Sequence, residues 1–161
     1  MIIRDEQAAD RAAVRRVIVA AFARAIEADL VDRLRDDGDV VLSLVAVDGD
    51  HVIGHVMFSR MDAPFRALAL APVAVTPERQ RAGVGSRLIR DGLDRARVTG
   101  WDGVFVLGDP HYYRRFGFDP ALARGFASAY AGPHLMACAL GGALPIRDGT
   151  IAYASAFTGL T

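Results

Sequence analysis

The first half of the chain has the apolar spacing of two helices followed by a hairpin. Apolar residues recur every three or four positions over 8–24 and again over 26–35, which is the pattern of amphipathic helices packed by one face. Two apolar segments of strand length follow, 40–47 and 51–58. The tripeptide Asp48-Gly49-Asp50 between them is a strong hairpin signal.

The middle of the chain predicts a strand, a short loop and a helix in succession. The apolar segment 67–75 has the length of a strand, and Pro72 within it predicts a kink or splay near its end. Residues 76–81 are polar and contain a proline, as a turn does. Helical spacing then runs from Gly83 to about Val98.

The order of elements predicts an α+β (α/β) fold in one domain spanning 1–161. The remaining expected elements are an edge strand at 2–4, a strand over 101–107, a short helix over 110–116, an irregular or partly helical stretch over 120–132, a strand over 135–140 and a last strand over 149–157. The sheet would be largely antiparallel with one strand–helix–strand crossover. If the strands ending at Val75 and Leu107 are parallel neighbours, the loops after them meet at one edge, a favoured place for ligands.

Composition and charge exclude several classes of protein. Lys plus Arg number 19 and Asp plus Glu number 19, so no general basic field favours nucleic acid. The single Cys138 allows no intrachain disulfide or cysteine-based metal cluster, and we expect it to be a small buried hydrophobe. Histidines and carboxylates show no metal spacing, so no catalytic metal is expected. Without a signal-peptide pattern or a membrane-length apolar run, we expect a cytoplasmic protein.

The junction between the middle strand and helix is suited to an anion. The first N–H groups of a helix have no partner within the helix and lie at the positive end of its dipole. Gly83 and Gly85 lack a Cβ, so a phosphate can approach the backbone closely. Arg79 and Arg81 add positive charge beside them.

The type of phosphate site is narrowed by the glycine spacing. A P-loop requires Gly-x-x-x-x-Gly-Lys-Ser/Thr, which does not occur, and a dinucleotide fingerprint requires a third glycine where this chain has Leu88. The segment Gln80-Arg-Ala-Gly-Val-Gly85 instead resembles the Gln/Arg-x-x-Gly-x-Gly/Ala loop of the GNAT N-acetyltransferases. In that superfamily the loop cradles the pyrophosphate of acetyl-coenzyme A.

The resemblance extends over most of the chain. The segment Val106-Leu-Gly-Asp-Pro-His-Tyr-Tyr-Arg-Arg-Phe-Gly-Phe118 is more specific than the glycine loop. Together with 27–35, 54–59 and 70–75, it is similar to a branch of small bacterial GNAT proteins, the YhbS type. The resemblance implies a mixed, mostly antiparallel sheet with two splayed parallel strands that form an acyl-coenzyme A cleft.

The resemblance also implies which residues bind acetyl-coenzyme A as a co-substrate. Backbone groups of Val73, Ala74 and Val75 would contact the pantetheine arm, and an N–H there would polarise the thioester carbonyl. The expected pyrophosphate loop is Gln80, Arg81, Ala82, Gly83, Val84, Gly85 and Ser86. Gly108, Asp109, Tyr112 and Phe116 complete the expected coenzyme site. Many relatives have Asn where this chain has Gly108-Asp109, which puts a side-chain contact there in doubt.

Two residues are candidates for proton transfer. The resemblance places Tyr113, four residues before the Gly117-Phe118 pair, near the coenzyme sulfur, where its hydroxyl would protonate or hydrogen-bond the leaving thiolate. Glu27 matches a Glu of the branch and is the candidate general base for the attacking amine. Each has a plain structural alternative: Tyr113 as a packing aromatic, and Glu27 as a first-turn acid favoured by the helix dipole. His55 is expected to be a partly buried structural residue.

Two functions of different class remain open. One is an N-acetyltransferase whose acceptor is an amine of a small molecule, peptide or protein. The other is a non-catalytic module that binds or senses acyl-coenzyme A. The acceptor site would be built from 22–34 and 124–134, and the protein would be a monomer or homodimer.

Overall fold

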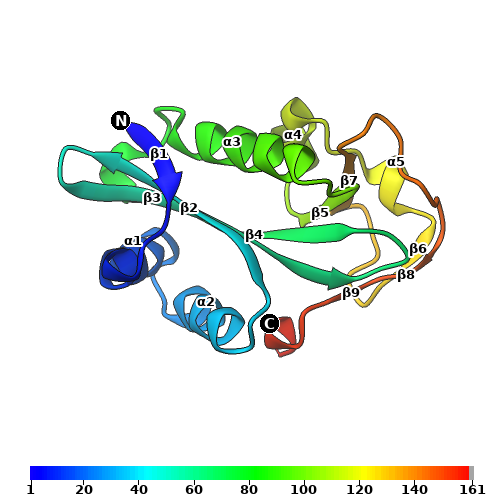
Figure 1. The fold of residues 1–161 in the computed structure, drawn as a ribbon, viewed down its shortest axis with the longest axis horizontal. Helices are drawn as coiled ribbons and strands as arrows, with labels where there is room; N and C mark the ends of the chain where they lie inside the picture. The colour runs from blue at the N-terminus through cyan, green and yellow to red at the C-terminus, as the bar shows by residue number, and fades with distance from the viewer. Residues whose placement is uncertain (160–161) are drawn as a thin grey trace.

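The computed structural model describes residues 1–159 and has a central sheet covered by helices on both faces (Figure 1). The strands are β1 (Ile2–Asp5), β2 (Val40–Asp48), β3 (His51–Asp62), β4 (Ala67–Val75), β5 (Gly103–Leu107), β6 (Phe126–Ala127), β7 (Leu135–Ala139), β8 (Gly149–Thr150) and β9 (Ala152–Tyr153). The helices are α1 (Arg11–Phe22), α2 (Ile26–Asp36), α3 (Val84–Val98), α4 (Pro110–Tyr113) and α5 (Pro120–Ala123). Short 3₁₀ turns lie at Ala8–Asp10, Pro77–Arg79, Arg114–Phe116 and Ser155–Phe157.

The main sheet has the strand order β1-β2-β3-β4-β5-β7, with β9 paired to the end of β3. All neighbours on this path are antiparallel except β4 and β5, which are parallel and joined through α3. This confirms the α+β (α/β) fold with a mostly antiparallel sheet and one crossover. It also confirms that the two strands followed by the candidate loops are parallel neighbours.

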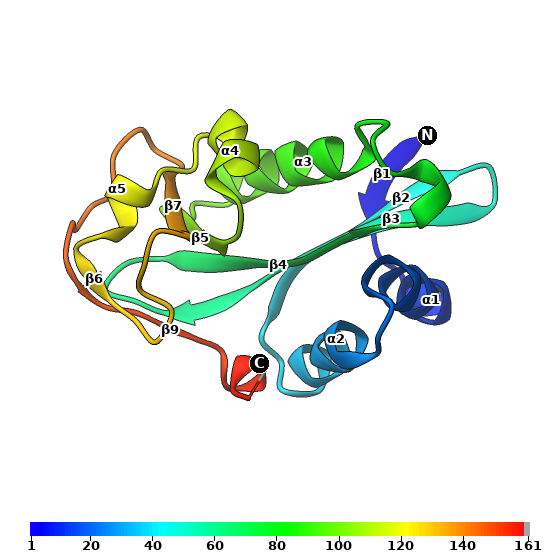
Figure 2. The same cartoon turned by 180° about the vertical axis from the view of Figure 1, so that it is seen from behind.

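Two hydrophobic layers hold the helices to the sheet. Below it, α1 and α2 bury their apolar stripes, including Ile18 and Leu34, against the β2–β4 surface (Figure 2). Above it, α3 buries Leu88 and Ile89 against the opposite face. The helix approaches closely at Gly92, where an added Cβ would lie 2.2 Å from Cε1 of Phe58. A glycine in mid-helix is therefore required by packing.

A bulge in β4 changes which side chains face α3. Val56 pairs with Val73 and Phe58 with Leu70, so β4 has one more residue than β3 between these two pairs. The extra residue falls at the Ala71–Pro72 step, and Pro72 has no N–H to contribute to a ladder. Leu70 faces the α3 layer before the bulge and Val73 faces it afterwards. The alternation of the strand has thus shifted by one residue.

The same bulge coincides with the splay of the two parallel strands. Pairing of β4 with β5 ends at Ala69, whereas β4 remains paired with β3 as far as Val75. The N–H of Thr76 donates to Ile53 at 2.9 Å, which sets the alternation of hydrogen-bonded pairs along β3 and β4. By that alternation the backbone N–H and C=O groups of Ala74 point to β3. Those of Val73 and Val75 point to the side where β4 and β5 separate.

A buried polar network ties α2 to the sheet under β3. The Ser43 hydroxyl donates to Oε2 of Glu6 at 2.8 Å, and Glu6 also forms an ion pair with Arg35. Nε2 of His55 lies 2.9 Å from the same hydroxyl oxygen. Because that hydroxyl has one proton, Nε2–H must be the donor to Ser43. His55 is completely buried, not partly buried as expected from the sequence.

The expected last strand over 149–157 is wrong. The stretch divides into β8, which pairs with β6, and β9, which pairs with β3, and then turns into a 3₁₀ helix. The change of partner occurs at Ile151, whose side chain is buried beside Phe105 and Phe126. Phe157 instead turns back into the α1–α2 layer, so no single straight strand satisfies both ends.

Candidate active site

The amino end of α3 lines the first of two cavities, which lie where β4 and β5 separate. Gly83 precedes the helix with φ of 87°, in the left-handed region that glycine adopts without strain. The cavity has a volume of about 370 Å³. It is lined by Val75, Arg79, Gln80, Arg81, Gly83, Val84, Gly85, Ser86, Tyr112 and Arg115. Most of the predicted pyrophosphate loop therefore lines one cavity; Ala82 is the loop residue that does not.

Two side chains of the loop stabilise its shape. Nε2 of Gln80 donates to the carbonyl of Val75 at 3.0 Å, which fastens the loop to the end of β4. Arg79 pairs with Asp48 of the β2–β3 turn, with Nη1 2.8 Å from Oδ2. Part of the positive charge expected from Arg79 is therefore balanced within the protein, and Arg81 and Arg115 are the other cationic residues of the cavity wall.

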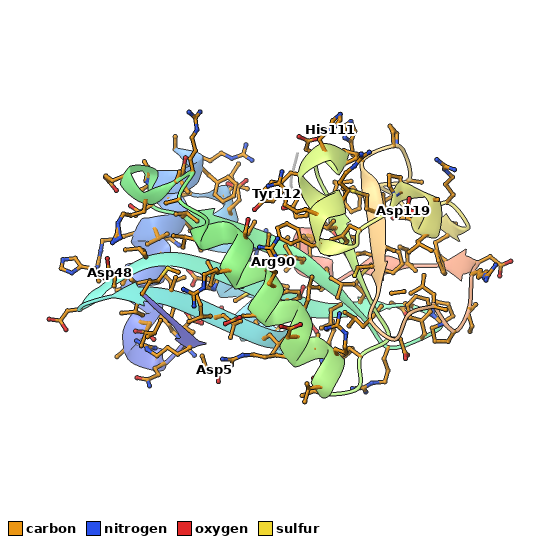
Figure 3. All side chains as sticks on the ribbon, turned by 90° about the horizontal axis from the view of Figure 1, so that it is seen from above. Asp5, Asp48, Arg90, His111, Tyr112 and Asp119 are labelled. Carbon is orange, nitrogen blue, oxygen red and sulfur yellow. The ribbon has the colours of Figure 1, made fainter. Side chains whose placement is uncertain are left out.

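Tyr112 closes the cavity from the side of α4. In the view from above the sheet, it lies between α3 and α4 (Figure 3). Its hydroxyl is 3.4 Å from Oγ of Ser86, and the guanidinium of Arg115 lies over its ring at 4.6 Å. An added Cβ on Gly85 would be 3.6 Å from the same hydroxyl. Because Gly85 has no side chain, this space beside the first backbone amides of α3 stays free.

A second cavity of about 350 Å³ lies on the other side of β4 and contains both candidate catalytic residues. Its lining comes from α1, α2, β4, β5, α4 and the carboxyl-terminal segments. The lining residues are Phe22, Arg24, Glu27, Leu30, Leu70, Ala71, Pro72, Val73, Leu107, Tyr113, Tyr130, Tyr153 and Phe157. Tyr113 and Glu27, 86 positions apart in the chain, are thus brought to the wall of one cavity by the parallel crossover and the α2 layer.

Tyr113 is held in an aromatic group at the start of the short helix. Its ring packs edge-on against Tyr112 at 5.0 Å and Phe118 at 5.8 Å between centroids. Burial, with a smaller contribution from the neighbouring Tyr112, raises the pKa of Tyr113 to about 12. The hydroxyl is therefore protonated at physiological pH and is available as a hydrogen-bond donor.

Glu27 is paired rather than free. Nε of Arg24 donates to its Oε1 at 2.9 Å, and Nη2 of Arg24 also contacts its Oε2. This hydrogen bonding lowers the pKa of Glu27 below its ordinary value, in spite of partial desolvation. A lower pKa weakens a carboxylate as a proton acceptor. Arg24 carried no sequence signal that predicted this contact.

The other residues expected at the coenzyme site have local structural partners. Oδ1 of Asp109 accepts the N–H of His111 at 3.0 Å and caps α4, as its position before Pro110 predicted. Phe116 packs against Tyr112 with centroids 5.3 Å apart, under the guanidinium of Arg90. Gly108, Asp109 and Phe116 are not among the lining residues of either cavity.

Three aromatic residues of the second cavity come from the last third of the chain. Tyr130 lies in the stretch that we expected to form the acceptor site. Tyr153 and Phe157 were assigned to a strand, and no motif marked them as lining residues. Period-two alternation would have been the only available signal, and the real backbone does not follow it here.

Two absences apply to the described part of the chain. Within residues 1–159, no helix combines the length and apolar character needed to cross a bilayer. In the same range, His, Cys, Asp and Glu form no group of three arranged to hold a metal ion.

Comparison with known proteins identifies the class to which this fold and site belong. Residues 6–118 match the Acetyltransferase (GNAT) family. The chain belongs to this family of acyltransferases.

Two similar proteins come from Escherichia coli. The chain is 41% identical over 133 residues to YjhQ of Escherichia coli K12, described as an uncharacterized N-acetyltransferase, covering 77% of this chain and 73% of that one. It is 38% identical over 125 residues to the similarly described YhbS of the same strain, covering 75% of each chain. These matches confirm the YhbS-type resemblance.

Two solved structures share the whole architecture. The structure of YhbS from Escherichia coli in complex with CoA superimposes with a TM-score of 0.92 at 32% identity, covering 99% of this chain and 93% of that one. A GNAT family acetyltransferase from Brucella melitensis in complex with acetyl-CoA gives a TM-score of 0.83 at 37% identity, covering 97% of each chain.

Proposed function

We propose that the protein transfers the acetyl group of acetyl-coenzyme A to a primary amine by direct attack. The observation that carries this proposal is the arrangement around β4. Val75 at the end of β4 lines the first cavity, at the helix mouth formed by the amino end of α3. Val73 lines the second cavity, which also contains Tyr113. A thioester carrier lying along this strand would have its diphosphate and its reacting carbon in different cavities. Relatives with the same fold were solved with CoA and acetyl-CoA.

Binding would use backbone groups more than side chains. The diphosphate would accept hydrogen bonds from the free amides at the start of α3, beside Arg81 and Arg115. The pantetheine arm would pair with the backbone of Val73 and Val75, which faces the splayed side. Ala74 is a weaker candidate for such pairing because its backbone groups face β3.

The chemical step would form one bond and break another. The neutral amine attacks the thioester carbonyl, and the backbone N–H of Val73, which lines the second cavity, stabilises the oxyanion. Collapse of this intermediate breaks the C–S bond and releases the coenzyme as a thiolate, and the amide forms as the attacking nitrogen loses its second proton to solvent. A tyrosine with a pKa of about 12 is a poor proton donor to a thiolate with a pKa of about 8–9. We therefore assign Tyr113 the role of stabilising the thiolate by hydrogen bonding.

The amine must lose a proton before it attacks. Glu27 lies in the correct cavity, but its pairing with Arg24 lowers its pKa and makes it a weak base. We propose that Glu27 attracts and orients the ammonium group. The proton then passes to solvent, directly or through water.

The direct test combines coenzyme binding with turnover. Calorimetry would measure acetyl-coenzyme A binding, and thiol release would measure transfer to amines. Gly85→Leu should fill the helix mouth and weaken coenzyme binding at least about tenfold, since several amide hydrogen bonds are blocked together. Asp94→Leu, at the exposed far side of the same helix, is the matched control. Unaltered binding in Gly85→Leu would contradict the site.

The second candidate function is non-catalytic binding of acyl-coenzyme A. The pairing of Glu27 with Arg24 favours it, because a site without a competent base can bind without turning over. Tight binding of acetyl-coenzyme A with no thiol release, for any amine in a broad panel and at any pH from 6 to 10, would support this alternative.

A further inference from the structure

We propose that the acyl acceptor is a small primary amine carried on an aromatic or branched apolar body. This inference rests on the proposed acetyl transfer and adds the chemical class of the acceptor. It is drawn from the walls of the second cavity, which contains the two candidate catalytic residues.

The cavity wall is dominated by aromatic rings from separate parts of the chain. Tyr130 packs edge-on against Tyr153 with centroids 5.2 Å apart, and Tyr153 packs against Phe157 at 5.1 Å. Phe22 and Tyr113 add further rings to the lining. Aromatic rings bind apolar groups by burying area and attract cations through their faces. An ammonium group with an apolar body satisfies both properties.

The apolar character continues to the rim. Phe22 and Leu107 both line the cavity and are among the exposed large hydrophobic residues, with 37% and 47% of their surfaces accessible. Exposed apolar residues that adjoin a cavity are typical of a site that takes an apolar ligand. Leu30 and Leu70 are buried in its lining.

The charged side chains in the cavity lining form a single ion pair. Arg24 and Glu27 are the only charged residues among those that line the cavity within 1–159, and they form an ion pair with each other. A polyamine would present several ammonium groups to a single carboxylate. The lining therefore fits an acceptor with one amine and an otherwise apolar surface.

One polar atom in the wall lacks a partner. The hydroxyl oxygen of Tyr153 is buried and has no hydrogen-bond partner among residues 1–159. A buried polar group without a partner costs about 1–3 kcal/mol, which a ligand atom or a water would recover. The second tyrosine hydroxyl, of Tyr130, makes a long bond of 3.4 Å to the carbonyl of Phe157. Both tyrosines line the cavity, and neither hydroxyl adds a charge to its wall.

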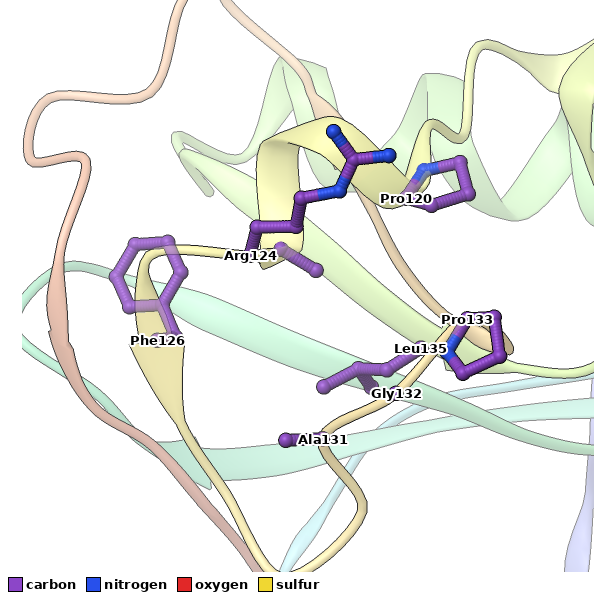
Figure 4. Close-up of a pocket in the computed structure, with 8 residues that line it drawn as sticks. Pro120, Arg124, Phe126, Ala131, Gly132, Pro133 and Leu135 are labelled. Atoms are coloured by element: carbon purple, nitrogen blue, oxygen red, sulfur yellow. The ribbon is translucent and has the colours of Figure 1, made fainter.

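The cavity size favours a small molecule. A volume of about 350 Å³ is near the lower limit of small-ligand sites, which span roughly 300–1,000 Å³. A third cavity of about 470 Å³ lies between α5 and the loop that includes Gly132 and Pro133 (Figure 4). Its lining shares no residue with the second cavity, so we do not assign it to the same acceptor.

The test is a ranking of acceptors by thiol release with saturating acetyl-coenzyme A. Phenethylamine, tyramine and isoamylamine are the apolar probes, and ethanolamine, putrescine and a lysine-containing peptide are the polar ones. We expect kcat/KM for the best apolar probe to exceed that of every polar probe at least about tenfold, since each well-fitted apolar group contributes about that factor. A polar probe that matches or exceeds the apolar probes overturns the inference.

A pair of variants locates the preference in this cavity. Phe22→Ser should lower kcat/KM for phenethylamine about tenfold and leave that for ethanolamine within about twofold. Leu122→Ser removes a similarly exposed apolar side chain that does not line the cavity, and should leave both values unchanged. An equal loss for both amines in Phe22→Ser would contradict the assignment.

Failure of this inference is distinguishable from failure of the proposed function. Calorimetry on the protein saturated with coenzyme A measures phenethylamine binding without turnover. Coenzyme binding with efficient acetylation of the peptide refutes the acceptor class and keeps the transferase. Coenzyme binding with neither binding nor turnover of the apolar probes also refutes the acceptor class. Absence of coenzyme binding refutes the proposed function itself.

Discussion

Gly108 lies against the ring of Tyr113: a Cβ built on Gly108 would be 2.6 Å from Cε2 of that ring and 3.2 Å from its Cδ2. Contacts below 3.0 Å do not persist in folded proteins, so the ring occupies its position because residue 108 has no side chain. Gly108 is therefore a packing partner of the candidate catalytic tyrosine.

Substitution of this glycine should displace the tyrosine without removing its hydroxyl. We expect Gly108→Ala to lower kcat at least about tenfold, because misplacement of a catalytic group by about 1 Å is sufficient for such a loss. The KM for acetyl-coenzyme A should change little, since the helix mouth is untouched. Gly141→Ala is the control, because no atom lies within 4 Å of its added Cβ. Wild-type kcat in Gly108→Ala would show that the position of Tyr113 is unimportant.

Removal of the hydroxyl of Tyr113 tests its proposed role directly. Tyr113→Phe should lower kcat about ten- to a hundredfold, which corresponds to the loss of one hydrogen bond to a charged group. Because the pKa of Tyr113 is raised to about 12, its ionisation should contribute no fall in rate between pH 7 and 10. Steady-state rates over this range for both proteins provide the measurement. Tyr112→Phe, which alters the first cavity, should instead raise the KM for the coenzyme.

The pH dependence of transfer should follow the amine and not Glu27. Arg24 lowers the pKa of Glu27 below its ordinary value of about 4.5, so this carboxylate remains ionised throughout pH 6–9. The acidic limb of the pH profile of kcat/KM should therefore move to lower pH when a strongly basic acceptor amine is replaced by a weakly basic one. Glu27→Gln should raise the KM of the amine and leave the shape of the profile intact. A limb that disappears in Glu27→Gln would instead identify it as the base.

Stability should decrease on acidification because of His55. Complete burial, with the nearby charge of Arg35, lowers the pKa of His55 from 6.5 to about 3. Between these values the unfolded chain binds a proton that the folded protein excludes. The free energy of unfolding should therefore fall by up to about 1.4 kcal/mol for each pH unit below 6.5.

Chemical denaturation at pH 7 and pH 4.5 provides the measurement. His55→Gln should show a smaller loss of stability between the two pH values than the wild type, whatever its stability at pH 7. The exposed His51 gives the matched control variant, His51→Gln, which should retain the wild-type difference. Equal pH dependence in all three proteins would exclude His55 as its source.

Local patterns predicted most of the fold because the relevant signals are short-range. Helical spacing located α2 and α3 within about one residue, and the Asp-Gly-Asp turn placed the β2–β3 hairpin. The turn before α3 was also predicted, and Gly83 there has a φ of 87°, in the left-handed region that glycine favours. The loop that we propose for the coenzyme diphosphate is thus largely visible in the sequence.

The acceptor side was less predictable because long-range contacts determine it. Nothing in the helical pattern indicated that Arg24 would pair with Glu27 rather than point to solvent. The stretch 149–157 alternates well enough to suggest a strand, but burial of Ile151 and Phe157 in different layers interrupts it. Tyr153 reaches the cavity only through that interruption.

The additional β4 residue at the Ala71–Pro72 step makes the cleft between β4 and β5 sensitive to deletions in this segment. Removing one residue there would leave one residue in each strand between the two flanking pairs of the ladder, so β4 could form an unbroken ladder with β3 while Val73 stays opposite Val56 and faces α3. Without the bend that accompanies a bulge, β4 would continue beside β5 beyond Ala69, and the backbone groups of Val73 and Val75 would pair with β5. Substitutions can change which side chains line this cleft, whereas deletion of one residue at the Ala71–Pro72 step would close it.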